Sequence, residues 1–176
     1  MTLAESVHAV FAPTGPLAGA VQEYRSRKGQ LQMAVAVAEV MEQGGMLVVE
    51  AGTGVGKTYA YLVPALLSGQ RVLLSTATKA LQDQLFGRDI PQLLGLLGVP
   101  LRVALLKGRS SYLCLYRTAL ARQERLLEEP AAMRQLGRIE QWAQATRTGD
   151  LAEVDSLADG SPLLPLLTST RDNCLG

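Results

Sequence analysis

A glycine-rich stretch, AGTGVGKT at residues 51–58, combines three glycines with a lysine and two threonines. Its spacing matches the phosphate-binding pattern G-x-x-x-x-G-K-[ST], except that alanine stands at the first position. Glycines allow a backbone to turn closely around a phosphate without side-chain clashes. We therefore expect the following residues to bind the phosphates of a nucleotide: Ala51, Gly52, Thr53, Gly54, Val55, Gly56, Lys57 and Thr58.

Two side chains of this stretch are the candidate catalytic residues. Lys57 would reach the β- and γ-phosphates of ATP, and the Thr58 hydroxyl would hold Mg²⁺. Backbone amides of the loop and of the following helix N-terminus would point at the same anion. The alternative is a glycine-rich turn that binds nothing, but an apolar run before it and a helical pattern after it favour phosphate binding.

The usual partner of such a loop is missing from the sequence. ATPases of this class also place a carboxylate at the end of an apolar strand to hold Mg²⁺. Apart from Glu50, which directly precedes the loop, no apolar run ends in Asp or Asp-Glu. The single histidine, His8, lies in a segment with no reason to approach the loop. The loop thus predicts nucleotide binding without specifying the reaction.

Short apolar runs alternate with helical patterns around the loop. Residues 46–50, 71–76 and 101–108 have the composition of buried parallel strands. Residues 58–70 and 79–98, which lie between them, have the composition of helices. Strands joined by short helical connections predict right-handed crossovers and a parallel sheet. We therefore expect an α/β nucleotide-binding core.

The pattern changes from about residue 110. Residues 115–149 predict one or two amphipathic helices broken at Pro130, and residues 150–176 form a turn-rich tail. We expect three regions: a lead-in segment 1–24, a partial nucleotide-binding domain 25–110, and a mostly helical unit 111–176.

Composition restricts the class of protein. The 176 residues carry a net charge of only +1, and 48% of them are hydrophobic. No run reaches the roughly 18 apolar residues of a membrane span, and the N-terminus lacks the features of a secretory signal. Six basic residues against two acidic ones in 71–109 favour a local positive face. We expect a cytoplasmic monomer without a disulfide between its two cysteines.

The stretches that flank the loop resemble the iron–sulfur helicases of the XPD and DinG type. Upstream, RSRKGQLQM resembles the family's Arg-x-x-Gln-x-x-Met element, although Gly29 replaces a common proline. The resemblance implies that Arg27, Gln30 and Met33 contact the adenine of the nucleotide.

Downstream, LLSTATKALQDQL resembles the family's second motif, which contacts DNA. Small hydroxyl residues let a backbone approach nucleic-acid phosphates without reading the bases. The candidate DNA contacts are Ser75, Thr76, Thr78, Lys79 and Gln82. The alternative is a capped helix start, in which Thr76 or Thr78 satisfies backbone amides.

The two cysteines lie in stretches that resemble cluster-binding segments of DinG-type helicases and of their YoaA branch. These stretches are ALLKGRSSYLCL and TSTRDNCLG. The resemblance implies that Cys114 and Cys174 are two of the four thiolate ligands of a [4Fe-4S] cluster. Without it, two isolated cysteines would be interpreted as small core residues.

The resemblance runs from Phe11 to Gly176 and implies the N-terminal fragment of a helicase, with the first half of a RecA-like motor domain and a truncated cluster domain. In the family, the Asp-Glu-x-His box that holds Mg²⁺ and the second motor domain follow the cluster domain. The full-length protein would be an ATP-dependent 5′–3′ helicase for single-stranded or forked DNA, working with repair or replication proteins. The chain alone would be inactive. Two other functions remain open: a small-molecule kinase, and a non-catalytic half-motor that binds ATP or DNA.

Overall fold

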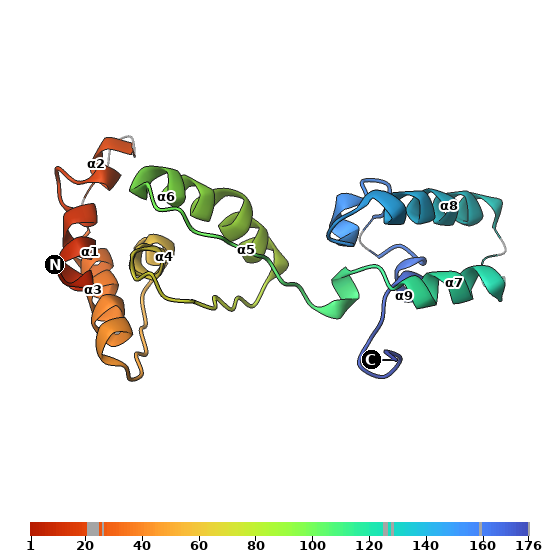
Figure 1. Ribbon diagram of the computed structural model, residues 1–176, viewed down its shortest axis with the longest axis horizontal. Coiled ribbons are helices and arrows are strands. Elements are labelled where there is room, and N and C mark those ends of the chain that lie inside the picture. Colours follow the sequence, from red (N-terminus) through yellow and green to blue (C-terminus); the bar gives the residue numbers. More distant parts are fainter. Residues whose placement is uncertain (21–24, 26, 125–126, 128, 159, 176) are drawn as a thin grey trace. The chain divides into compact units, whose positions relative to one another are not determined.

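The computed structural model describes residues 1–20, 25, 27–124, 127, 129–158 and 160–175 (Figure 1). The chain divides into two compact units, Met1–Leu105 and Leu106–Gly176. The sequence predicted a boundary at residue 110. The predicted lead-in segment 1–24 includes residues 21–24, which lie outside the described residues. Each unit has an apolar core of its own.

The first unit consists of helices joined by extended connections. Helix α3 packs against both α1 and α4, and α6 also contacts α4. Their shared core buries Phe11, Ala34, Leu62 and Leu93 almost completely. The elements of this unit are α1 (Leu3–Phe11), α2 (Pro16–Ala20), α3 (Lys28–Gln43), α4 (Lys57–Leu67), α5 (Lys79–Gln84), the π-helical turn η1 (Leu85–Asp89) and α6 (Ile90–Leu97).

Local sequence signals explain where two of these helices begin or end. Helix α1 starts with a capping box, in which the Thr2 hydroxyl accepts from Glu5 N and the Glu5 carboxylate accepts from Thr2 N. Such reciprocal bonds satisfy two of the backbone donors that every helix start leaves unpaired. Helix α3 ends at Gly44, whose φ of 78° is accessible to glycine without strain.

The expectation of an α/β fold with a parallel sheet is wrong. The described part of the chain contains no β-strand, and its one strand-like pairing is an isolated antiparallel bridge between Tyr112 and Asp150. The runs 46–50, 71–76 and 101–108, predicted as buried strands, are irregular connections and largely exposed.

The physical reason is that these runs are apolar and extended, but no other backbone segment among the described residues pairs with them in a sheet. Side-chain exposure alternates along them, as it does along an extended backbone. Val48 is 88% exposed, whereas its neighbours Leu47 and Val49 are 39% and 40% exposed. A strand also needs a second backbone to receive its hydrogen bonds. The sequence pattern indicates the extended conformation but carries no information on that pairing.

The second unit is helical with short turns. Helix α7 contacts α9, and α8 begins at Pro130, where the sequence predicted a break. Proline is well suited to a first helical turn because the missing N–H has no partner there anyway. The core of this unit buries Leu136, Ile139, Leu151 and Leu167. The elements are η2 (Arg109–Ser111), α7 (Leu115–Gln123), α8 (Pro130–Ala145), η3 (Leu151–Glu153) and α9 (Leu164–Leu167).

A buried ion pair joins the start of the second unit to its middle. Lys107 Nζ lies 2.8 Å from Asp150 Oδ2, and the two side chains are only 6% and 15% exposed. The backbone N–H of Lys107 also donates to the Tyr112 hydroxyl at 2.8 Å. Because Tyr112 is bridged to Asp150, the three residues form one connected group.

No helix in the described part of the chain is both long and apolar enough to cross a bilayer.

Candidate nucleotide-binding site

The phosphate loop leads directly into helix α4. Gly54 and Gly56 have φ values of 76° and 89°, in the left-handed region that favours glycine. Gly56 is the N-cap of α4 and has no side chain that could cap the helix. The first backbone hydrogen bond of the helix runs from Ala60 N to Gly56 O. The N–H groups of residues 57–59 therefore remain as donors at the positive end of the helix dipole. This arrangement suits an anion.

Lys57 brings a positive charge to the same place. Its ammonium donates to the carbonyl oxygens of Ala51 and Gly52, both at 2.7 Å. A Cβ added at Gly52 or at Gly54 would meet no atom within 4 Å, so the loop has open space beside it. The loop thus offers a nucleotide phosphate a positive charge from Lys57, backbone N–H donors and open space.

Two of the three residues that the sequence linked to adenine contact the loop itself. The Arg27 guanidinium donates to Gly54 O, and Gln30 Nε2 donates to Gly56 O at 2.9 Å. A Cβ at Gly56 would come within 2.2 Å of Gln30 Nε2, so the Gln30 side chain would have to move, and the φ of 89° would strain any other residue there. Arg27 and Gln30 therefore hold the two left-handed glycines from the side of α3.

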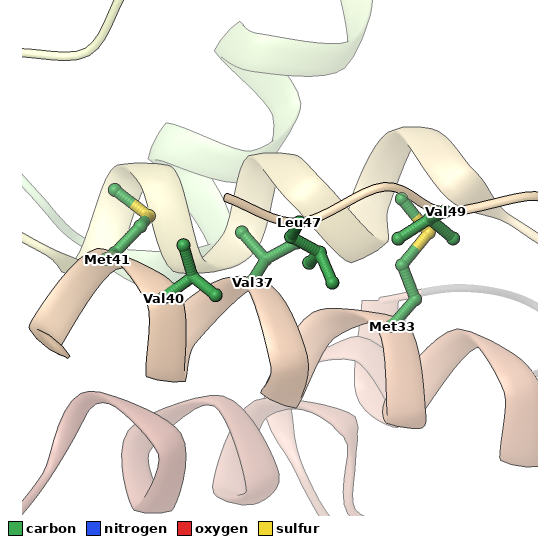
Figure 2. A pocket seen from close by; sticks show the side chains of 6 residues that line it. All are labelled: Met33, Val37, Val40, Met41, Leu47 and Val49. Atoms are coloured by element: carbon green, nitrogen blue, oxygen red, sulfur yellow. The ribbon is translucent and has the colours of Figure 1, made fainter. Parts of the chain in front are cut away.

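Met33, the third of these residues, lies one turn further along α3. It lines a groove of about 370 Å³ together with Val37, Val40 and Met41 of α3 and with Leu47 and Val49 of the segment before the loop. Figure 2 shows these six side chains between the helix and the segment. The six lining side chains are all apolar, so polar side-chain contacts to a ligand do not come from this groove.

The candidate DNA contacts cluster at the start of α5. Ser75 and Thr76 lie in the connection before the helix, and Lys79 is its first residue. Thr78 is the N-cap, and its hydroxyl accepts from Leu81 N at 3.3 Å. Ser75, Thr78 and Lys79 are exposed, whereas Thr76 and Gln82 are half-buried. The geometry shows the capping role of Thr78; DNA contact by this group stays a prediction.

Thr78→Ala is expected to loosen α5. Loss of a threonine cap costs about 1 kcal/mol, so the opening free energy of the amides in α5 should fall by that amount. Native-state hydrogen exchange of the Leu81 amide measures it directly. Thr76→Ala is the matched control, because the Thr76 hydroxyl makes only a 3.5 Å contact to Thr78 O. Equal exchange in both variants would contradict the capping role.

The two cysteines supply only half of an iron–sulfur ligand set. Cys114 is the half-buried N-cap of α7, and its backbone N–H donates to Leu167 O at 2.7 Å. Cys174 is exposed and follows a turn in which Thr170 N donates to Asn173 Oδ1 at 2.7 Å. The described residues contain no group of three or more metal-ligating side chains. A cluster needs four ligands, and the two cysteines would supply half of them.

Two tyrosines on α4 were not among the predicted site residues. Burial, and secondarily the charge of Asp89, raises the pKa of the Tyr59 phenol, which donates to Gln92 Oε1 at 3.0 Å. Burial also raises the pKa of Tyr61, opposed by a hydrogen bond with the Thr58 side chain. The i, i+3 spacing of Thr58 and Tyr61 was the available signal, because such residues are neighbours on a helix surface.

Comparison with known proteins identifies the family. A family model described as DEAD/DEAH box helicase matches residues 28–140, more than half of the chain. The chain belongs to the DEAD/DEAH box helicase family. This match covers the phosphate loop, α4 and the α5 region, and it favours a helicase over a small-molecule kinase with the same loop.

Individual helicases are similar over nearly all of the chain. The chain is 49% identical over 172 residues to the ATP-dependent DNA helicase YoaA of Escherichia coli, an alignment that covers 94% of the chain and 26% of that protein. It is 43% identical over 167 residues to the ATP-dependent DNA helicase YoaA of Haemophilus influenzae, an alignment that covers 95% of the chain and 26% of that protein. It is 42% identical to the ATP-dependent helicase DinG of Mycobacterium tuberculosis H37Ra over 171 residues, 85% of the chain and 26% of that protein. The predicted resemblance to DinG- and YoaA-type helicases is confirmed. The chain spans about a quarter of the length of these relatives.

Proposed function

We propose that the chain provides the ATP-binding part of an ATP-dependent DNA helicase. The observation that carries this proposal is the loop at residues 51–58, with the Lys57 ammonium, the uncapped start of α4 and the Arg27 and Gln30 contacts around it. Lys57 binds the β- and γ-phosphates, the loop amides surround them, and Thr58 contributes a ligand to Mg²⁺.

A finer proposal concerns the whole protein. By its similarity to the family, it moves 5′ to 3′ on single-stranded or forked DNA and acts in repair or replication restart. The DNA phosphates bind along Ser75, Thr76, Thr78, Lys79 and Gln82, so binding is largely independent of sequence and weakens with salt. Cys114 and Cys174 provide two ligands of a [4Fe-4S] cluster, and two further thiolates come from outside this chain.

Unwinding by the complete polypeptide tests this proposal. Duplexes that carry a 5′ single-stranded tail should be separated when ATP and Mg²⁺ are present, and duplexes with only a 3′ tail should not. Cys114→Ser should lower the iron content of the purified protein and its unwinding rate together.

The matched control is Ser110→Ala, four residues before Cys114 and outside the proposed ligand set. It should leave iron content and unwinding unchanged. Preference for the 3′ tail would contradict the direction, and full iron content in Cys114→Ser would contradict the ligand assignment. Absence of ATP-dependent unwinding on every substrate would contradict the helicase function itself.

A further inference from the structure

An exposed phenylalanine follows the candidate DNA contacts along the same helix. The chain contains two phenylalanines. Phe11 is 1% exposed in the core of the first unit, whereas Phe86 is 40% exposed. A single exposed apolar side chain is common on protein surfaces, so the surroundings of Phe86 decide what it can do.

A π-helical turn places Phe86 on the outside of this helix. The turn η1 joins α5 to α6 without a break (Figure 1), and Ile90 N donates to Leu85 O across it. Leu85 and Asp89, the two ends of the turn, are buried, whereas the three residues between them, Phe86 among them, are exposed. A Cβ added at Gly87 would meet no atom within 4 Å, so the space next to Phe86 is open. Turns of this kind are frequently found at functional sites.

Phe86 lies on the same face of the helix as two of the candidate DNA contacts. Residues three or four positions apart are neighbours on a helix surface. Gln82 follows Lys79 by three positions, and Phe86 follows Gln82 by four. Phe86 is therefore two turns beyond Lys79, about 10 Å along the helix axis. A short stretch of single-stranded DNA can contact both residues.

The charges on this face favour a phosphate at the start of the helix and a base further along it. Lys79 is exposed at the first position of α5, next to the N-cap Thr78. The exposed Asp83 lies on the same face, between Lys79 and Phe86, and its negative charge disfavours a second phosphate there. The Phe86 ring carries no charge and no hydrogen-bonding group. The part of a nucleotide that it suits is the flat face of a base.

We propose that Phe86 stacks on a base of single-stranded DNA, one phosphate of which binds at Thr78 and Lys79. This inference rests on the proposed function, and it adds a contact with a base to the proposed contacts with phosphates. Every base has a π-face, so stacking on an aromatic side chain tolerates any sequence. The contact therefore strengthens binding without making it specific.

Phe86→Ala tests the proposal with two fluorescently labelled strands of equal length. One strand is oligo-dT, and the other carries abasic sites, so that only its sugars and phosphates remain. The anisotropy of each strand, titrated with the complete polypeptide in the absence of ATP, gives the dissociation constant. Phe86→Ala should weaken binding of oligo-dT about 5- to 150-fold and leave binding of the abasic strand unchanged. Phe86→Trp, which keeps an aromatic face, should bind oligo-dT like the unsubstituted protein.

Met46→Ala is the matched control for the loss of an exposed apolar side chain. Met46 is 89% exposed in the connection after α3, outside the proposed DNA contacts, so its loss should change neither dissociation constant. Unchanged affinity of Phe86→Ala for oligo-dT would overturn the proposal, as would an equal loss of affinity for the abasic strand. If the unsubstituted protein bound neither strand at micromolar concentration, the proposed DNA binding itself would fall, and the role of Phe86 with it.

Discussion

Lys57→Ala is expected to weaken ATP binding about 10- to 100-fold. The Lys57 ammonium lies at the loop, 2.7 Å from two of its carbonyl oxygens, next to the uncapped start of α4. Hydrogen bonds to charged groups contribute about 1.5–3 kcal/mol, and every 1.4 kcal/mol changes a dissociation constant about tenfold. Titration with mant-ATP in the presence of Mg²⁺ measures the change.

Lys79→Ala is the control for the loss of a positive charge. Lys79 is an exposed residue of the same unit, at the start of α5 and outside the phosphate loop. This variant should bind ATP like the unsubstituted chain. Circular dichroism should also show that Lys57→Ala retains the helices of the first unit. Unchanged ATP affinity in a folded Lys57→Ala variant would rule out the phosphate-loop assignment.

Asp150→Asn is expected to lower the free energy of unfolding of the second unit by about 3 kcal/mol. The substitution keeps the shape of the side chain but removes the negative charge that lies 2.8 Å from the Lys107 ammonium. Removing one partner of a buried pair commonly costs about 3–5 kcal/mol. Asparagine retains an oxygen for the Ala152 amide, which Asp150 Oδ1 caps at 3.0 Å, so the lost charge accounts for the effect.

Urea unfolding followed by tryptophan fluorescence measures this loss in the intact chain. Trp142 is the single tryptophan and packs on the core of the second unit, so its signal reports that unit. Glu140→Gln is the matched control, because the Arg122–Glu140 pair is far more exposed than Lys107–Asp150. The control should barely shift the midpoint. A similarly small shift for Asp150→Asn would show that the buried pair contributes little to stability.

Local sequence patterns explain some features of the fold but not others. The start of α8 at Pro130 and the end of α3 at Gly44 follow from backbone preferences of single residues. The parallel sheet was predicted from three apolar runs, and it is absent from the described chain. Strand pairing joins residues far apart in sequence, so the periodicity of one run does not contain it.

In the candidate site, too, local sequence patterns predict some features, whereas others depend on tertiary packing. The pattern at residues 51–58 predicts phosphate binding because all of its groups are consecutive in the chain. The contacts of Arg27 and Gln30 with the loop span 27 and 26 residues and depend on how α3 packs beside it. The sequence suggested these two residues by resemblance, but as contacts of adenine and not of the loop backbone.

By itself, the sequence determined the helicase family and predicted phosphate binding by the loop at residues 51–58, since both depend on short patterns of residue type and spacing. The tertiary structure decided which distant groups meet. It brings Lys107 to Asp150 and Gln30 to Gly56, and among the described residues it forms no sheet from the three apolar runs. The physical reason is that burial and hydrogen-bond pairing are properties of the packed chain, whereas loop chemistry resides in neighbouring residues.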